Sequence, residues 1–289
     1  MKHSWVITCF LLVLFFAAQV IGLKITQSYI DMQASKEQGK LIWKELPAIA
    51  GMKLERPDVE PQFSIWYIIG AVIIGTLLIL LIIRFGKVLL WKLWFYCAVV
   101  LCLQVALAAF IPALASFILA LVFGYFKVFR PNIYIHNATE LFLYGGLAAI
   151  FVPILNVLYA FILLLALSCY DMYAVWQSKH MIKMAKFQTQ SGIFAGLLIP
   201  YKVPAVVARG PKKPARTAVL GGGDIGFPLI FSGTVLAASG FVPALVVSLG
   251  AAAALFVLLL FSQKNKFYPA MPFLTLGCAI GYIVAFYGF

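Results

Sequence analysis

The chain has 289 residues, of which 64% are hydrophobic and 11% are charged. Soluble globular domains carry about 25% charged residues, so this composition excludes that class. The formal net charge of +13 does not indicate a nucleic-acid partner, because the basic residues lie in loops between long apolar runs.

The apolar runs predict an all-α protein, a polytopic bundle of nine transmembrane helices. Several runs approach or exceed the roughly 20 residues that cross a bilayer as a helix. The weak alternation of a membrane β-barrel is absent. We expect the helices at residues 4–23, 64–83, 88–107, 109–129, 138–156, 157–177, 220–240, 242–263 and 267–288.

The first apolar run is interpreted as a retained membrane anchor. A cleaved signal peptide is the alternative, since the run has a short basic start, an apolar core and small residues after it. Cleavage would leave eight spans and would not reverse the others.

The basic residues predict the topology of the bundle. Of the 22 Lys and Arg residues, 16 fall before the first span or in alternate loops after it, and the other six lie in 24–63 beside six acids. The positive-inside rule therefore places the N-terminus in the cytoplasm and the C-terminus outside.

The same pattern divides the chain into three parts. Residues 1–177 form a six-span part, 178–219 a basic cytoplasmic loop, and 220–289 a three-span part. The loop contains no acid and is rich in Gly and Pro, so we expect it to be mobile.

The remaining polar residues are given structural roles. Asn137 and Glu140 have the spacing of a capping box and are predicted to open the fifth helix. The five cysteines lie in apolar runs without CxxC spacing, and the three histidines are scattered. We therefore expect packing cysteines, no metal site and no cofactor.

Two acids stand apart, because Asp171 and Asp224 lie inside apolar runs. A charged side chain at mid-membrane costs about 2.5–3.5 kcal/mol on insertion scales, so such residues are functional candidates. At 1.5 Å per residue, Asp171 lies ~9 Å and Asp224 ~6 Å from the cytoplasmic ends of their spans. The two antiparallel helices therefore bring both carboxyl groups to a similar depth.

Two backbone features share that depth. Gly221, Gly222 and Gly223 precede Asp224 and remove side-chain bulk at a helix start, which also fits plain small-residue packing. The segment Pro269-Ala270-Met271-Pro272 opens the last span. Its prolines disfavour a regular helix, although a simple proline-rich helix start fits them as well.

These motifs together resemble those of the intramembrane aspartyl proteases, the family of presenilin and signal peptide peptidase. That family carries YD, GxGD and PAL motifs on spans six, seven and nine. The corresponding residues are Tyr170-Asp171, Gly221-Gly222-Gly223-Asp224 and Pro269-Ala270-Met271-Pro272. The short chain looks most like the compact archaeal presenilin homologues.

The chain departs from the family pattern at two positions. Gly222 stands where the family more often has Leu, and Met271 replaces the Leu of PAL. Met conserves the volume of Leu, so we expect the role of that segment to survive.

The resemblance implies an aspartyl endopeptidase that hydrolyses peptide bonds within transmembrane helices. Asp171 and Asp224 would be catalytic, and the other motif residues would contact substrate or support the acids. The implied setting is a prokaryotic, archaeal plasma membrane. The partners would be the lipid bilayer and single-span membrane proteins, and homo-oligomers are allowed. We expect 206–209 and 215–219 to form a hairpin that pairs with an unwound substrate.

Two other classes compete with this interpretation. Proton-coupled transporters and ion channels also carry intramembrane acids and broken helices. A non-catalytic chaperone or pseudoprotease is the third class, and the presence of both aspartates argues against it.

Overall fold

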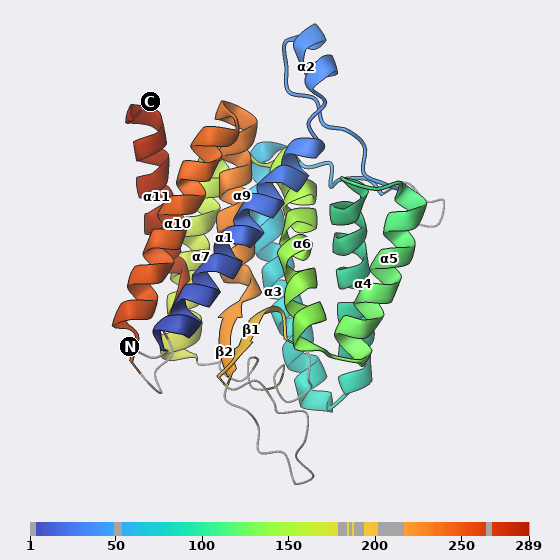
Figure 1. The fold of residues 1–289 in the computed structure, drawn as a ribbon, viewed down its shortest axis with the longest axis vertical. Helices are drawn as coiled ribbons and strands as arrows, with labels where there is room; N and C mark the ends of the chain where they lie inside the picture. The colour runs from blue at the N-terminus through green and yellow to red at the C-terminus, as the bar shows by residue number, and fades with distance from the viewer. Residues whose placement is uncertain are drawn as a thin grey trace.

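A computed structural model describes residues 4–48, 54–178, 184, 187, 194–201, 217–263 and 268–288 of the chain. The described part is a helical bundle with a two-stranded sheet at one end (Figure 1). The long helices are α1 (Trp5–Ser28), α3 (Pro61–Phe85), α4 (Val88–Ala108), α5 (Ala113–Phe129), α6 (Ile133–Phe151), α7 (Val157–Met172), α9 (Gly222–Ser239), α10 (Phe241–Phe261) and α11 (Met271–Tyr287).

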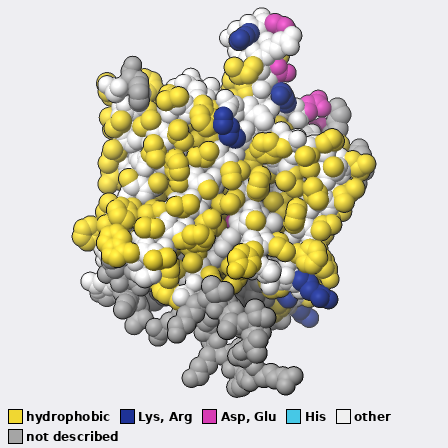
Figure 2. Space-filling model, viewed as in Figure 1, with side chains coloured by type: hydrophobic (Ala, Val, Ile, Leu, Met, Phe, Trp, Pro, Cys, Tyr) yellow, Lys and Arg dark blue, Asp and Glu magenta, His cyan; other side chains and the backbone are white. Residues whose placement is uncertain are grey.

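Each range predicted to be helical overlaps one of these helices in the described residues, with ends shifted by up to five positions. Six helices there are long and apolar enough to cross a membrane, namely α1, α3, α4, α6, α7 and α10. Helices α5 and α11 are apolar but shorter. Figure 2 shows hydrophobic side chains covering the flank of the bundle, with charged side chains gathered near its two ends. The architecture is that of an integral, multi-pass membrane protein.

The segment after α1 contains a short helix that we did not predict, α2 (Met32–Gln38), which Asp31 caps by accepting from the Ala34 amide. The segment is tied to the bundle on both sides of α2. The Tyr29 hydroxyl donates to the Val105 carbonyl at 2.7 Å. Burial raises the pKa of Tyr29 to about 12, so this hydroxyl stays protonated at neutral pH.

The predicted capping box is wrong. Helix α6 begins at Ile133, because Asn132 already supplies a cap by accepting from the Tyr134 amide at 2.9 Å. Asn137 and Glu140 therefore lie inside the helix, where their side chains make tertiary contacts instead.

Two short strands lie within, or across the end of, the segment 178–219 that was predicted to be a mobile loop. Strand β1 (Gly196–Pro200) pairs antiparallel with β2 (Thr217–Gly221). The predicted strand 215–219 overlaps β2. Its predicted partner, 206–209, lies outside the described residues, and β2 pairs with the earlier strand β1. Most of the predicted mobile loop also lies outside them. Alternate strand residues are buried against the bundle: Leu197, Ile199, Ala218 and Leu220.

Glycines let the helices approach closely where α6 crosses α4. A Cβ built on Gly146 would overlap the backbone carbonyl of Cys102, and backbone cannot move aside as a side chain can. Helix contacts of this kind give membrane bundles much of their packing energy, since there is no hydrophobic drive between helices in lipid.

We predict that Gly146→Ala destabilises the protein by roughly 1–3 kcal/mol, the usual cost of overpacking. Gly70→Ala is the matched control, because a Cβ on this α3 glycine has no atom within 4 Å. Thermal unfolding in detergent, followed by tryptophan fluorescence, should show a lower midpoint for the first variant only. Equal midpoints for the two variants would contradict the packing argument.

Candidate active site

Asp171 and Asp224 lie on neighbouring helices of the bundle. Asp171 is in the last turn of α7, is 5% exposed, and is followed by a π-helical turn, η2 (Tyr173–Gln177). Asp224 is in the first turn of α9. The start of α9 adjoins the sheet, at the lower end of the bundle in Figure 1. The two helices that carry these acids pack against each other.

The PAL-like segment reaches Asp171 through its backbone. The Met271 amide donates to Asp171 Oδ2 at 3.1 Å, and the Ala270 amide also bonds this carboxylate. Ala270 is the N-cap and Met271 the first residue of α11, where amides have no partner within the helix. The helix N-terminus therefore supplies donors and a positive dipole end to an acid on another helix.

Side-chain hydroxyls align α7 and α11 for this contact. Ser168 and Thr275 bond each other at 2.8 Å, and Ser168 also donates to the Leu164 carbonyl at 2.8 Å. Ser168 lies one helical turn before Asp171, and Thr275 one turn after Met271. The hydroxyl pair thus sets the register in which the acid meets the α11 amides.

Asp224 is held by the glycine segment itself. It is the third residue of α9, and its carboxylate accepts from the amide of the N-cap residue Gly221, as the acid of a capping box does. A Cβ on Gly221 would lie 3.1 Å from Asp224 Oδ2, and one on Gly222 would lie 2.6 Å from Tyr144 Oη. A side chain at Gly221 would therefore crowd the carboxylate, and one at Gly222 would force Tyr144 to move.

The other predicted site residues are Tyr170, Gly223, Pro269 and Pro272. The Tyr170 hydroxyl contacts Thr76 Oγ1 of α3 at 3.3 Å, in keeping with a supporting role. A Cβ on Gly223 would meet only the Phe227 ring, at 3.5 Å, so this glycine is not constrained by space. Pro269 and Pro272 flank the two residues whose amides bond Asp171. No group of three His, Cys, Asp or Glu in the described residues is placed to hold a metal.

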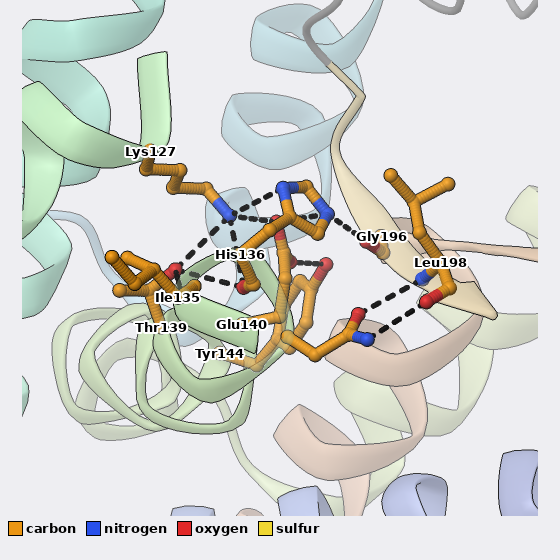
Figure 3. Close-up of polar contacts among 9 residues, drawn as sticks. Lys127, Ile135, His136, Thr139, Glu140, Tyr144, Gly196 and Leu198 are labelled. Carbon is orange, nitrogen blue, oxygen red and sulfur yellow. Dashed lines mark hydrogen bonds and ion pairs between the residues drawn. The ribbon is translucent and has the colours of Figure 1, made fainter. Parts of the chain in front are cut away.

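Sequence reasoning missed a buried polar cluster beside Gly222, formed by Lys127, His136, Glu140 and Tyr144 (Figure 3). The available signal was the spacing of Glu140 and Tyr144, which are one helical turn apart and share a face. Because Glu140 was interpreted as a capping residue, its pairing with Tyr144 was not predicted.

A family profile described as "Signal-peptide peptidase, presenilin aspartyl protease" matches residues 41–289. The chain belongs to this family. It is thus an intramembrane aspartic endopeptidase, and the transporter or channel alternative is set aside.

The fold of the protease is similar to two solved structures, each described as a presenilin family intramembrane aspartate protease. The one in space group C222 has 20% sequence identity and a TM-score of 0.63, covering 96% of this chain and 98% of its own. The one in space group P2 has 20% identity and a TM-score of 0.61, covering 95% of each chain. At that identity the likeness shows the fold alone. No curated protein matches the chain in sequence.

The contact between Met271 and Asp171 predicts different results for two substitutions. Met271→Leu keeps the amide and nearly the same volume, so proteolysis should stay within about twofold of the parent. Met271→Pro removes the N–H at a helical position that tolerates proline, so proteolysis should fall by roughly tenfold or more.

The measurement is the rate of cleavage of a labelled single-span peptide, with thermal unfolding recorded beside it. Ala270 has a helical backbone conformation, which a proline at position 271 would disfavour. The unfolding midpoint therefore shows how much of any loss of proteolysis comes from destabilisation of the fold. Full activity of Met271→Pro would contradict the role given to this amide.

Proposed function

We propose that Asp171 and Asp224 are the catalytic pair with which the protease cleaves transmembrane helices of single-span membrane proteins. The observation that carries this proposal is the Met271 amide on the Asp171 carboxylate, together with the packing of α7 against α9, the helix that carries Asp224. A family aspartyl protease needs two acids, and only three acids follow Glu60 in the sequence. The third, Glu140, is bonded to Lys127.

Two neighbouring carboxyl groups that share one proton can hydrolyse an amide. Like charges a few Å apart do not both ionise easily, so the pair holds one proton. The ionised member takes a proton from a water molecule while the oxygen of that water attacks the carbonyl carbon. The protonated member donates its proton to the carbonyl oxygen. A proton then passes to the nitrogen, the C–N bond breaks, and the pair regains its single proton. The titration belongs to the pair rather than to either residue.

A helical substrate has to unwind before its backbone reaches these acids. Strand β2 supports a role in receiving it, because β2 ends at Gly221 and leads within three residues to Asp224. An extended substrate segment beside this sheet would gain main-chain hydrogen bonds by strand addition.

The proposal includes nine spans, with the N-terminus in the cytoplasm and the C-terminus outside. Support comes from the distribution of basic residues and from the two termini, which lie at opposite ends of the bundle (Figure 1). The six-span part, 1–177, carries Asp171 and the three-span part, 220–289, carries Asp224. The proposed setting is an archaeal plasma membrane, with lipid and single-span membrane proteins as the partners.

We predict that Asp171→Asn and Asp224→Asn each abolish cleavage, and that the double variant loses no more than either single one. Residues that act as a unit show this non-additivity. Thermal unfolding should show folded proteins, since each change removes a membrane-buried charge. Residual cleavage above a few per cent of the parent rate in either single variant would falsify the pair.

We also predict that substrates with an outside N-terminus and a cytoplasmic C-terminus are preferred. The topology makes α7 run inward and α9 return, which fixes the direction in which a scissile strand meets the two acids. One transmembrane sequence is presented in both orientations in liposomes, and the products are located by mass spectrometry. The first cut should fall toward the cytoplasmic side. Equal cleavage of both orientations, or a preference for the reverse one, would contradict this prediction.

A further inference from the structure

The buried polar cluster of Lys127, His136, Glu140 and Tyr144 lies where α5, α6 and β1 meet (Figure 3). Lys127 Nζ contacts Glu140 Oε1 at 2.6 Å, and both side chains are at most 1% exposed. Lys127 Nζ also lies 3.2 Å from Thr139 Oγ1 and 3.3 Å from His136 Nδ1. The Tyr144 hydroxyl donates to the second Glu140 oxygen, Oε2. The cluster thus binds both carboxylate oxygens of Glu140.

The hydrogen bonds of His136 define its tautomer. Its Nε2 lies 2.7 Å from the Gly196 carbonyl, which only accepts, so Nε2 carries the proton. Its Nδ1 then accepts from the Lys127 ammonium. The imidazole is therefore neutral in this arrangement, and the cluster contains one positive and one negative charge.

A deeply buried ion pair such as that of Lys127 and Glu140 need not increase the stability of the fold. Replacing a buried pair by packed apolar residues is often neutral or stabilising, so its presence calls for another reason. The cluster offers that reason by its position, because its helix α6 contacts β1, the strand that pairs with the segment leading to Asp224, and its Tyr144 contacts Gly222 in that segment.

The first point of contact is β1. His136 bonds the Gly196 carbonyl, and the Asn137 amide pairs with both the N–H and the C=O of Leu198, at 3.0 and 2.7 Å. The second point is Gly222, where the absence of a side chain leaves just enough room for the Tyr144 hydroxyl. That hydroxyl is also within electrostatic range of Asp224.

We propose that Glu140 and Tyr144 are positioning residues for the reaction, acting through Gly222 on the placement of Asp224. Glu140, paired with Lys127, orients the Tyr144 hydroxyl, and the hydroxyl packs on the Gly222 backbone two residues before the acid. This inference rests on the proposed function, in which Asp224 is catalytic. A displacement of about 1 Å at a reacting group can cost on the order of 10²-fold in rate.

The test compares two tyrosines that lose the same atom. Tyr144→Phe removes the hydroxyl against Gly222, whereas Tyr29→Phe removes a similarly buried hydroxyl that bonds Val105, on a segment far from the acids. Rates are measured with a labelled single-span peptide and the full chain. Tyr144→Phe should lower kcat by roughly tenfold or more and leave KM within about twofold. Tyr29→Phe should leave kcat unchanged. A kcat for Tyr144→Phe within twofold of the parent, or an equal loss in both variants, overturns the proposal.

A second comparison tests whether the effect passes through Gly222. Gly222→Ala puts a methyl group against the Tyr144 hydroxyl and should lower kcat in the parent, but much less in the Tyr144→Phe background, where that oxygen is gone. Interacting residues show such coupling, whereas independent ones give losses that multiply. Multiplying losses would overturn the proposal. Asp224→Asn is measured in parallel to separate the proposed function from the positioning role. If Asp224→Asn stays active, the proposed function fails. If Asp224→Asn is inactive while Tyr144→Phe and Gly222→Ala keep the parent rate, the positioning role fails.

Discussion

Both acids of the proposed catalytic pair are held by the N-termini of helices, and the rest of the candidate site depends on this. The first amides of α11 bond Asp171, and the N-cap amide of α9 bonds Asp224. A carboxylate inside a membrane protein loses most of its hydration, so it needs fixed donors, and unpaired first-turn amides with the dipole behind them are suited to that task. The prolines at 269 and 272 and the glycines at 221–223 are the sequence features that create these helix starts.

The two acids differ in what fixes their positions. Asp171 belongs to a continuous helix, and the Ser168–Thr275 hydroxyl pair aligns that helix with α11. Asp224 stands at a junction between strand and helix, where the backbone has no such constraint of its own. The sheet and the buried cluster on α6 supply it, because β1 is bonded to His136 and Asn137 and pairs in turn with β2. An aspartate held in this way depends on contacts from four separate parts of the chain.

The sequence predicted the parts of the fold that follow from local physical rules. Apolar runs near the length of a bilayer gave helices close to their observed bounds, and two acids inside such runs led to the two helices that meet. Tertiary partners decided the rest. Asn137 does not cap α6, because Asn132 caps this helix at an earlier position. Strand β2 pairs with 196–200 because α6 anchors that strand. The restriction at Gly222 comes from Tyr144, a residue far away in sequence, so glycine spacing alone does not reveal it.

The most direct measurement for the central claim is an experimental structure of the protease with a transition-state analogue whose hydroxyl mimics the tetrahedral intermediate. Two acids that share one proton and activate one water should both touch that hydroxyl. We predict that it lies within hydrogen-bonding distance, roughly 2.5–3.2 Å, of one carboxylate oxygen of Asp171 and one of Asp224. A bound analogue whose hydroxyl contacts only one of these acids, or neither, would contradict the account.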